Sequence, residues 1–306
     1  MTEKDYFLPT NDYVFKRIFG YVGNEKITKA LLNAILDERV TKVDLDKNPI
    51  TEKDLYDDKV GILDVRTTFN DQIDCDIEMQ VTMQKEIAER ILFYWSKMYV
   101  KNIHQGGNYA DLKRTIVILI TDFEMENLSK ITKGHTEWKV REKDFQNIVL
   151  TDVLELHIIE ISKLKKYADK TEQKDLLHWV EFLANPEKIG GIKMEDTEND
   201  EALRKALEVY EDLSKDEHER YLAELRMKHI LDSRALKNEG YENGVRDGME
   251  KGRKEGKIEG AKQNTLKIAN EMLKEGESIE KIIRYTGLTK EEIEEIKKNN
   301  SDYKDR

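Results

Sequence analysis

Two acidic residues on neighbouring predicted strands are the strongest candidates for chemistry in this sequence. Asp64 interrupts the apolar run of residues 60–65, where a carboxylate is costly to desolvate unless it has a partner, a proton or a metal. Residues 73–81 alternate strictly between apolar and polar side chains, and Glu78 and Gln80 lie on the polar side. This alternation predicts a half-buried strand.

The length of the turn between these strands decides whether the two acids meet. A two-residue loop at Asn70 and Asp71 would place Asp64 opposite Ile77. A three-residue loop would place Asp64 opposite Glu78, on one face of the sheet. A metal site requires the second register, or a β-bulge with the same result.

Asp64, Glu78 and Gln80 together offer the oxygen ligands that Mg²⁺ prefers. Such an ion can polarise a phosphodiester and lower the pKa of a bound water. The alternative is a solvated sheet face with scattered acids, and the pattern alone leaves both interpretations open.

The motifs LDVR, with Asp64, and IEMQ, with Glu78 and Gln80, resemble the PD-(D/E)XK nuclease motif. The chain is most similar to the transposase and recombination-promoting nuclease family within that group. Flanking stretches carry the same resemblance, which covers roughly residues 5 to 165: NDYVFKRIFG, ERILFYWSKMYV and GGNYADLKRTIVILITDF.

The resemblance implies a metal-dependent DNA endonuclease linked to recombination or transposition, with Asp64 and Glu78 as the metal ligands. Gln80 stands where the wider group usually carries Lys, which removes a cation that would orient water or offset charge. A catalytically weakened module for DNA binding or self-association is therefore the alternative, and a self-associating helical scaffold is a third possibility.

A predicted helix that begins at Asn11 or Asp12 carries a second block of candidates. The resemblance matches at Asp12, Phe15 and Lys16, which implies that this helix lies near the active site. An ordinary surface pair between Asp12 and Lys16, one turn apart, is the alternative.

A predicted helix over residues 84–104 has a stripe of basic and aromatic side chains: Arg90, Tyr94, Lys97 and Lys101. Basic residues along one helix face suit a phosphate backbone, and the resemblance assigns Arg90 and Tyr94 to substrate binding. A solvated face, with Glu86 paired to Arg90, is the alternative.

The remaining pattern predicts an α/β fold with a restriction-endonuclease-like mixed sheet flanked by helices. Residues 114–121 are a nearly continuous β-branched run, typical of a central strand covered on both faces. Residues 41–47 predict an edge strand, and residues 138–140 and 155–161 predict two further strands. We expect a nuclease-like core over residues 1–170 and a helical region over 171–238.

Six glycines recur at every fourth position in a charged segment, residues 239–262: Gly240, Gly244, Gly248, Gly252, Gly256 and Gly260. They would disfavour an isolated helix by on the order of 5 kcal/mol. The segment is either a linker or a helix whose glycines admit a second backbone, and we expect a homodimer formed through the C-terminal helical region.

The tail, residues 263–306, predicts three short helices whose spacing resembles a helix-turn-helix unit. Its last segment, TKEEIEEI, is acidic, which favours a packing or oligomerisation role over base reading.

Composition restricts the class of protein. The 306 residues carry a net charge of −11 and include one cysteine, Cys75, which excludes an internal disulfide. No apolar run reaches the roughly 20 residues of a membrane span, and the first residues lack the apolar core of a secretory signal. We therefore expect a cytoplasmic protein without membrane contact. The six histidines lack zinc-site spacing.

Overall fold

The computed structural model describes residues 7–47, 65–83, 85–103, 106–167, 173–191 and 197–301. These residues belong to two compact units, 1–234 and 235–306. The first unit contains a six-stranded sheet in the order β1-β2-β3-β4-β6-β5. The strands are β1 (Val43–Leu45), β2 (Val65–Phe69), β3 (Ile73–Gln80), β4 (Arg114–Thr121), β5 (His135–Arg141) and β6 (Val149–Glu160).

The sheet is mixed, as the sequence predicts. β1, β2 and β3 pair antiparallel, β3, β4 and β6 pair parallel, and β5 returns antiparallel along β6. β4 lies inside the sheet with seven of its eight residues buried, and β1 is an edge strand. The α/β fold with its restriction-endonuclease-like mixed sheet is confirmed.

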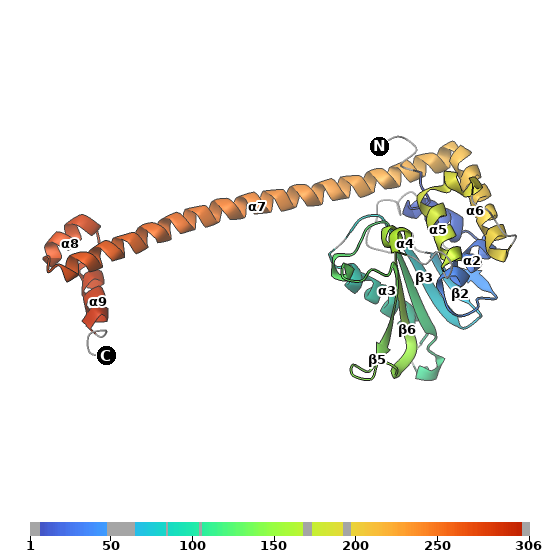
Figure 1. Ribbon diagram of the computed structural model, residues 1–306, viewed down its shortest axis with the longest axis horizontal. Coiled ribbons are helices and arrows are strands. Elements are labelled where there is room, and N and C mark those ends of the chain that lie inside the picture. The colour runs from blue at the N-terminus through green and yellow to red at the C-terminus, as the bar shows by residue number, and fades with distance from the viewer. Residues whose placement is uncertain are drawn as a thin grey trace. The chain divides into compact units, whose positions relative to one another are not determined.

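Helices cover both faces of this sheet, so each face has its own core. The helices of the first unit are α1 (Asp12–Phe19), α2 (Glu25–Ile35), α3 (Ile87–Lys101), α4 (Ile161–Tyr167), α5 (Lys174–Ala184), α6 (Glu198–Lys215) and the first part of α7 (Glu217–Lys274). α1, α2, α5 and α6 share the larger core with one face. α3 packs on the other face, and Figure 1 shows it across the sheet from α2 and α5.

The polar side of β3 corrects one expectation. Alternation along this strand predicts an apolar buried side and a polar solvated side, yet Asp76 is fully buried and Glu78 is only 2% exposed. The prediction of a half-buried strand is wrong because α3 covers the polar side, where Ile87 and Ile91 pack against neighbouring strands. Buried carboxylates need compensating partners, and the site supplies them.

The second unit contains the rest of α7 together with α8 (Ile279–Thr286) and α9 (Lys290–Ser301). Ala269, Ile282 and Ile293 form its small core. Gly287 ends α8 with a φ of 72°, a conformation that glycine adopts without penalty. The Gly-spaced segment is helical, as one of its two interpretations required. None of the helices in the described ranges is both long and apolar enough to span a membrane.

Candidate active site

The β2–β3 hairpin sets which side chains face one another. Val65 pairs with Ile77 and Phe69 with Ile73, so the loop has three residues. Asn70 and Asp71 make this turn with φ values of 50° and 61°, a region that Asn and Asp tolerate better than most side chains. The predicted register is therefore confirmed for the described pairs. Asp64 lies outside the described residues, so its position opposite Glu78 stays a prediction.

Glu78 is the centre of a polar cluster beneath α3. Its Oε1 accepts a hydrogen bond of 2.6 Å from an Nη of Arg90 and another of 2.6 Å from Nε2 of Gln80. Charge-assisted bonds this short are strong, and both donors hold the carboxylate in place. The alternative pairing of Arg90 with Glu86 is wrong as a side-chain contact, because the guanidinium turns inward to Glu78 instead.

Sequence reasoning missed a second Arg–carboxylate contact on the same face. Arg66 of β2 stands opposite Asp76 of β3, and its Nε lies 3.8 Å from Oδ1 of that buried carboxylate. The three-residue-loop register also predicts this pair, two residues nearer the turn on each strand than the predicted Asp64–Glu78 pair. Two buried acids and two arginines thus share one face of the sheet.

Tyr94 supports Arg90 from within the fold. Its ring is 3% exposed, and the Arg90 guanidinium carbon lies 5.4 Å from the ring centroid, within cation–π range. The predicted stripe on α3 therefore divides: Arg90 contacts Glu78 and the buried Tyr94 packs beside Arg90, whereas Lys97 and Lys101 are exposed.

The two residues predicted on helix α1, Asp12 and Lys16, lie in different surroundings. The Asp12 carboxylate accepts bonds of 2.7 to 3.1 Å from Arg226 of α7. Lys16 is 5% exposed. A Cβ added to Gly20 would lie 3.2 Å from Cγ of Lys16 and 3.2 Å from Cγ2 of Val65, so these two side chains flank the same glycine. A surface pair between Asp12 and Lys16 is thus wrong, since both are buried. Lys16 lies beside the first described residue of β2.

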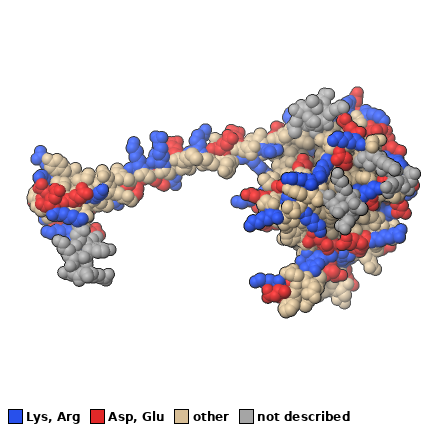
Figure 2. Space-filling model, viewed as in Figure 1, with Lys and Arg blue, Asp and Glu red and all other residues tan. Residues whose placement is uncertain are grey.

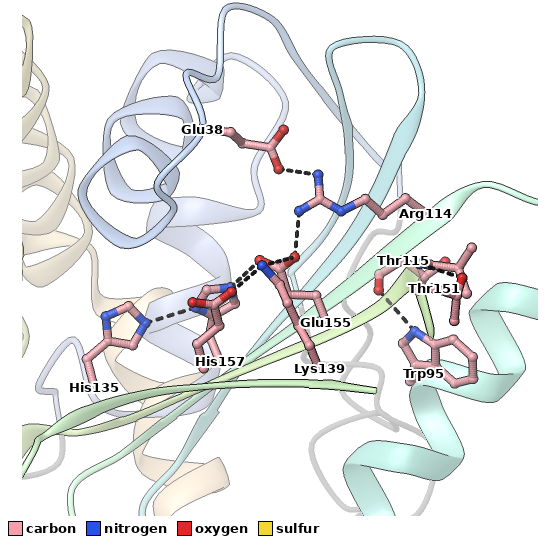
Figure 3. A network of polar contacts seen from close by, with 11 residues as sticks. Glu38, Trp95, Arg114, Thr115, His135, Lys139, Thr151, Glu155 and His157 are labelled. Carbon is pink, nitrogen blue, oxygen red and sulfur yellow. Dashed lines mark hydrogen bonds and ion pairs between the residues drawn. The ribbon is translucent and has the colours of Figure 1, made fainter. Parts of the chain in front are cut away.

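A second polar network lies on the opposite face, where Figure 3 shows it extending from Glu38 to His135. Arg114 donates to both Glu38 and Glu155 at 2.5 Å. Glu155 and His157 are joined at 2.8 Å, and His157 and His135 at 2.9 Å. Burial raises the pKa of Glu155, but hydrogen bonds from His157 and Arg114 lower this pKa to about 2. Burial and the neighbouring His157 lower the pKa of His135 to about 4.

The donors around Glu78 fit a hard divalent cation by their chemistry. Carboxylate and amide oxygens are ligands that Mg²⁺ accepts, and Glu78 and Gln80 supply both kinds, with Asp64 as the predicted second carboxylate. Within the described ranges, which exclude Asp64, no three His, Cys, Asp or Glu side chains gather as a metal-holding group.

Comparison with family models decides the relationship. The model described as PD-(D/E)XK nuclease family transposase matches residues 9–240, more than half of the chain. The chain belongs to this PD-(D/E)XK family. A second model, described as the Rpn/YhgA-like nuclease family C-terminal HTH domain, matches residues 262–298. No curated protein and no solved structure matches the chain.

Family membership bears on the hairpin and on the tail. The matched range of the PD-(D/E)XK model includes the complete hairpin and α3, so the buried cluster around Glu78 lies within the nuclease-family part. The HTH match spans α8, most of α9 and the end of α7, which agrees with the helix-turn-helix spacing in the sequence.

Proposed function

We propose that this chain is a DNA endonuclease that depends on Mg²⁺ or another divalent cation. It acts in recombination or transposition, and in the cytoplasm. The observation that carries the proposal is the buried Glu78, held by Arg90 and Gln80 on the polar face of the hairpin. Membership of the nuclease family supports it.

Each proposed role follows from the chemistry of a side chain. Asp64 and Glu78 would hold the cation, which when bound supplies positive charge to a phosphodiester and acidifies water. Gln80 orients the attacking water, or serves as a ligand through its carbonyl. Arg90 binds the scissile phosphate, whose oxygens accept hydrogen bonds from the planar guanidinium, and Tyr94 positions Arg90.

The N-terminal helix contributes differently. Lys16 lies beside Val65, whose side chain packs in the larger core on the other face of the sheet from Glu78, so a contact of Lys16 with the substrate remains a prediction. Because Arg226 already engages Asp12, we infer that Asp12 acts on the site only by anchoring α1. The four-part division of the chain at residues 170, 238 and 262 remains a prediction.

Plasmid nicking by the purified protein tests the activity. We expect nicking with Mg²⁺, none with a chelator, and none by Asp64→Asn with Mg²⁺. Wild-type nicking by Asp64→Asn would contradict the assignment.

A weakened nuclease fold is the second candidate, and Gln80 favours it because an amide replaces the usual ammonium. It predicts DNA binding without nicking, and nicking gained by Gln80→Lys. The HTH match also makes the tail a candidate DNA contact, although Glu291, Glu292, Glu294 and Glu295 make α9 acidic.

We further propose that the chain forms a homodimer through the Gly-spaced part of α7. A Cβ built on any of its six glycines would meet no described atom within 4 Å. Contacts within the described residues therefore give no reason for these glycines, whereas a second backbone would.

A further inference from the structure

A groove of about 490 Å³ lies on the same sheet face as Glu78, between the β2–β3 hairpin and the C-terminal half of α3. Its charged lining consists of four cations and two acids: Arg66, Lys97, Lys101, Lys113, Asp46 and Asp74. The groove is thus positive, although the whole chain has a net charge of −11.

Of the two acids that line the groove, Asp74 is already engaged by its neighbours. The Asp74 carboxylate accepts 2.9 Å and 2.7 Å hydrogen bonds from Thr68 and Asn102, and Nζ of Lys113 lies 3.8 Å away. By contrast, Lys97 and Lys101 are exposed and lie within 4 Å of no carboxylate in the described parts of the chain. Two lysines therefore remain available to an anion.

The groove is also aligned with the candidate active site. Asp74 precedes Glu78 by four residues on β3, which corresponds to about 13 Å along the strand. Arg66 lies between them, opposite Asp76. At about 3.4 Å per nucleotide of one strand, this separation spans about four nucleotides.

We propose that this groove is a second backbone-binding subsite, which takes phosphates of the DNA strand a few nucleotides from the bond that is cut. Lys97 and Lys101 act as point charges at the rim of the groove, and Arg66 lies between this rim and Glu78. Contacts of this kind position a strand without reading its sequence. The proposal rests on the proposed function for the identity of the ligand.

The test is fluorescence anisotropy with labelled DNA, in chelator, over a range of salt concentrations. The double variant K97Q/K101Q removes two charges and keeps good helix formers on α3. We expect it to bind more weakly, with a slope of log affinity against log salt that is shallower by about 1.5 to 2. The loss should be the same for unrelated DNA sequences.

A matched control is K26Q/K205Q, which makes the same charge change on α2 and α6, at the opposite face of the sheet. We expect this control to keep the wild-type slope. An unchanged slope in K97Q/K101Q, an equal loss in both double variants, or no salt-dependent DNA binding by the wild type would each overturn the subsite.

Metal-free binding separates this proposal from the proposed function. A salt slope that falls only in K97Q/K101Q supports the subsite even where the wild type, supplied with Mg²⁺, cuts nothing. Mg²⁺-dependent nicking together with an unchanged slope supports the nuclease and rejects the subsite.

Discussion

Glu78 illustrates how a single residue combines a stability role with a chemical one. Three acids at alternating positions of β3 suggest mutual repulsion, which the removal of one acid should relieve. The structure changes that expectation because Arg90 and Gln80 already bond to Glu78. Removing the carboxylate would leave a partly buried guanidinium without this partner.

We therefore expect Glu78→Ala to lower the free energy of unfolding by about 3 kcal/mol, as measured by urea denaturation. Glu78→Gln keeps a carbonyl for Arg90 and should be destabilised less. Both variants should lose Mg²⁺-dependent nicking. A Glu78→Ala protein as stable as the wild type would show that the pair contributes nothing to folding.

His135 makes stability depend on pH. Its pKa is about 4 in the folded protein and about 6.5 when unfolded, so the unfolded chain binds more protons between these values. The resulting stabilisation is complete above pH 6.5 and is lost as the pH falls toward 4. Its full size is about 3 kcal/mol at most. Glu155, with a pKa of about 2, loses its contribution at still lower pH, below about 4.5.

Urea denaturation of wild type and His135→Gln at pH 7 and pH 4.5 tests this. Glutamine keeps an N–H donor toward His157 but does not titrate in this range. The wild type should lose more stability than the variant between the two pH values. Equal losses would mean that His135 does not titrate in this window.

At the scale of elements, the segment between β4 and β5 is hydrogen-bonded to the end of β6. Glu160 accepts a hydrogen bond from the Met125 N–H at 2.6 Å and pairs with the buried Lys163 at 2.8 Å. Gly134 completes the contact, because a Cβ there would lie 2.3 Å from the Leu164 nitrogen. The missing side chain allows the backbone before β5 to pack on α4.

Gly134→Ala should therefore destabilise the first unit by about 3 kcal/mol, as expected for overpacking against backbone atoms. Gly190→Ala is the matched control, since a Cβ there meets nothing within 4 Å. The comparison is made by thermal or urea unfolding. Equal stability of the two variants would mean that the backbone moves apart without cost.

At the scale of the whole molecule, helix α7 contributes residues to both compact units. Its first turns belong to the first unit, where Ala223 is fully buried and Arg226 binds Asp12. Its later turns carry the six glycines, and Figure 2 shows basic and acidic side chains interspersed with other residues along this helix. Six glycines disfavour a helix by on the order of 5 kcal/mol relative to alanine.

We expect close backbone packing against a second copy to offset this cost through dispersion and weak Cα–H···O contacts. Replacing Gly248 and Gly252 together by Leu should then break the dimer, although both changes raise helix propensity. Light scattering measures the mass. A wild type that is monomeric at micromolar concentration would make the segment a spacer only.

The sequence by itself determined most of the elements and reduced the hairpin to two possible registers. Alternation in β3 and the β-branched run in β4 are local properties, because side-chain period depends on neighbouring residues, whereas the pairing of β2 with β3 in the structure selected the three-residue loop. They were sufficient to place Glu78 and Gln80 on one strand face and to place Arg90 on the next helix.

Tertiary structure decided what covers that face and which charges meet. The burial of Asp76 and Glu78 depends on α3 packing over them, and the Arg226–Asp12 contact joins residues 214 positions apart. The groove likewise combines residues of β2, β3 and α3 with Lys113 from the loop before β4. Contacts between distant segments follow from how elements pack, and no local pattern in a single sequence encodes that packing.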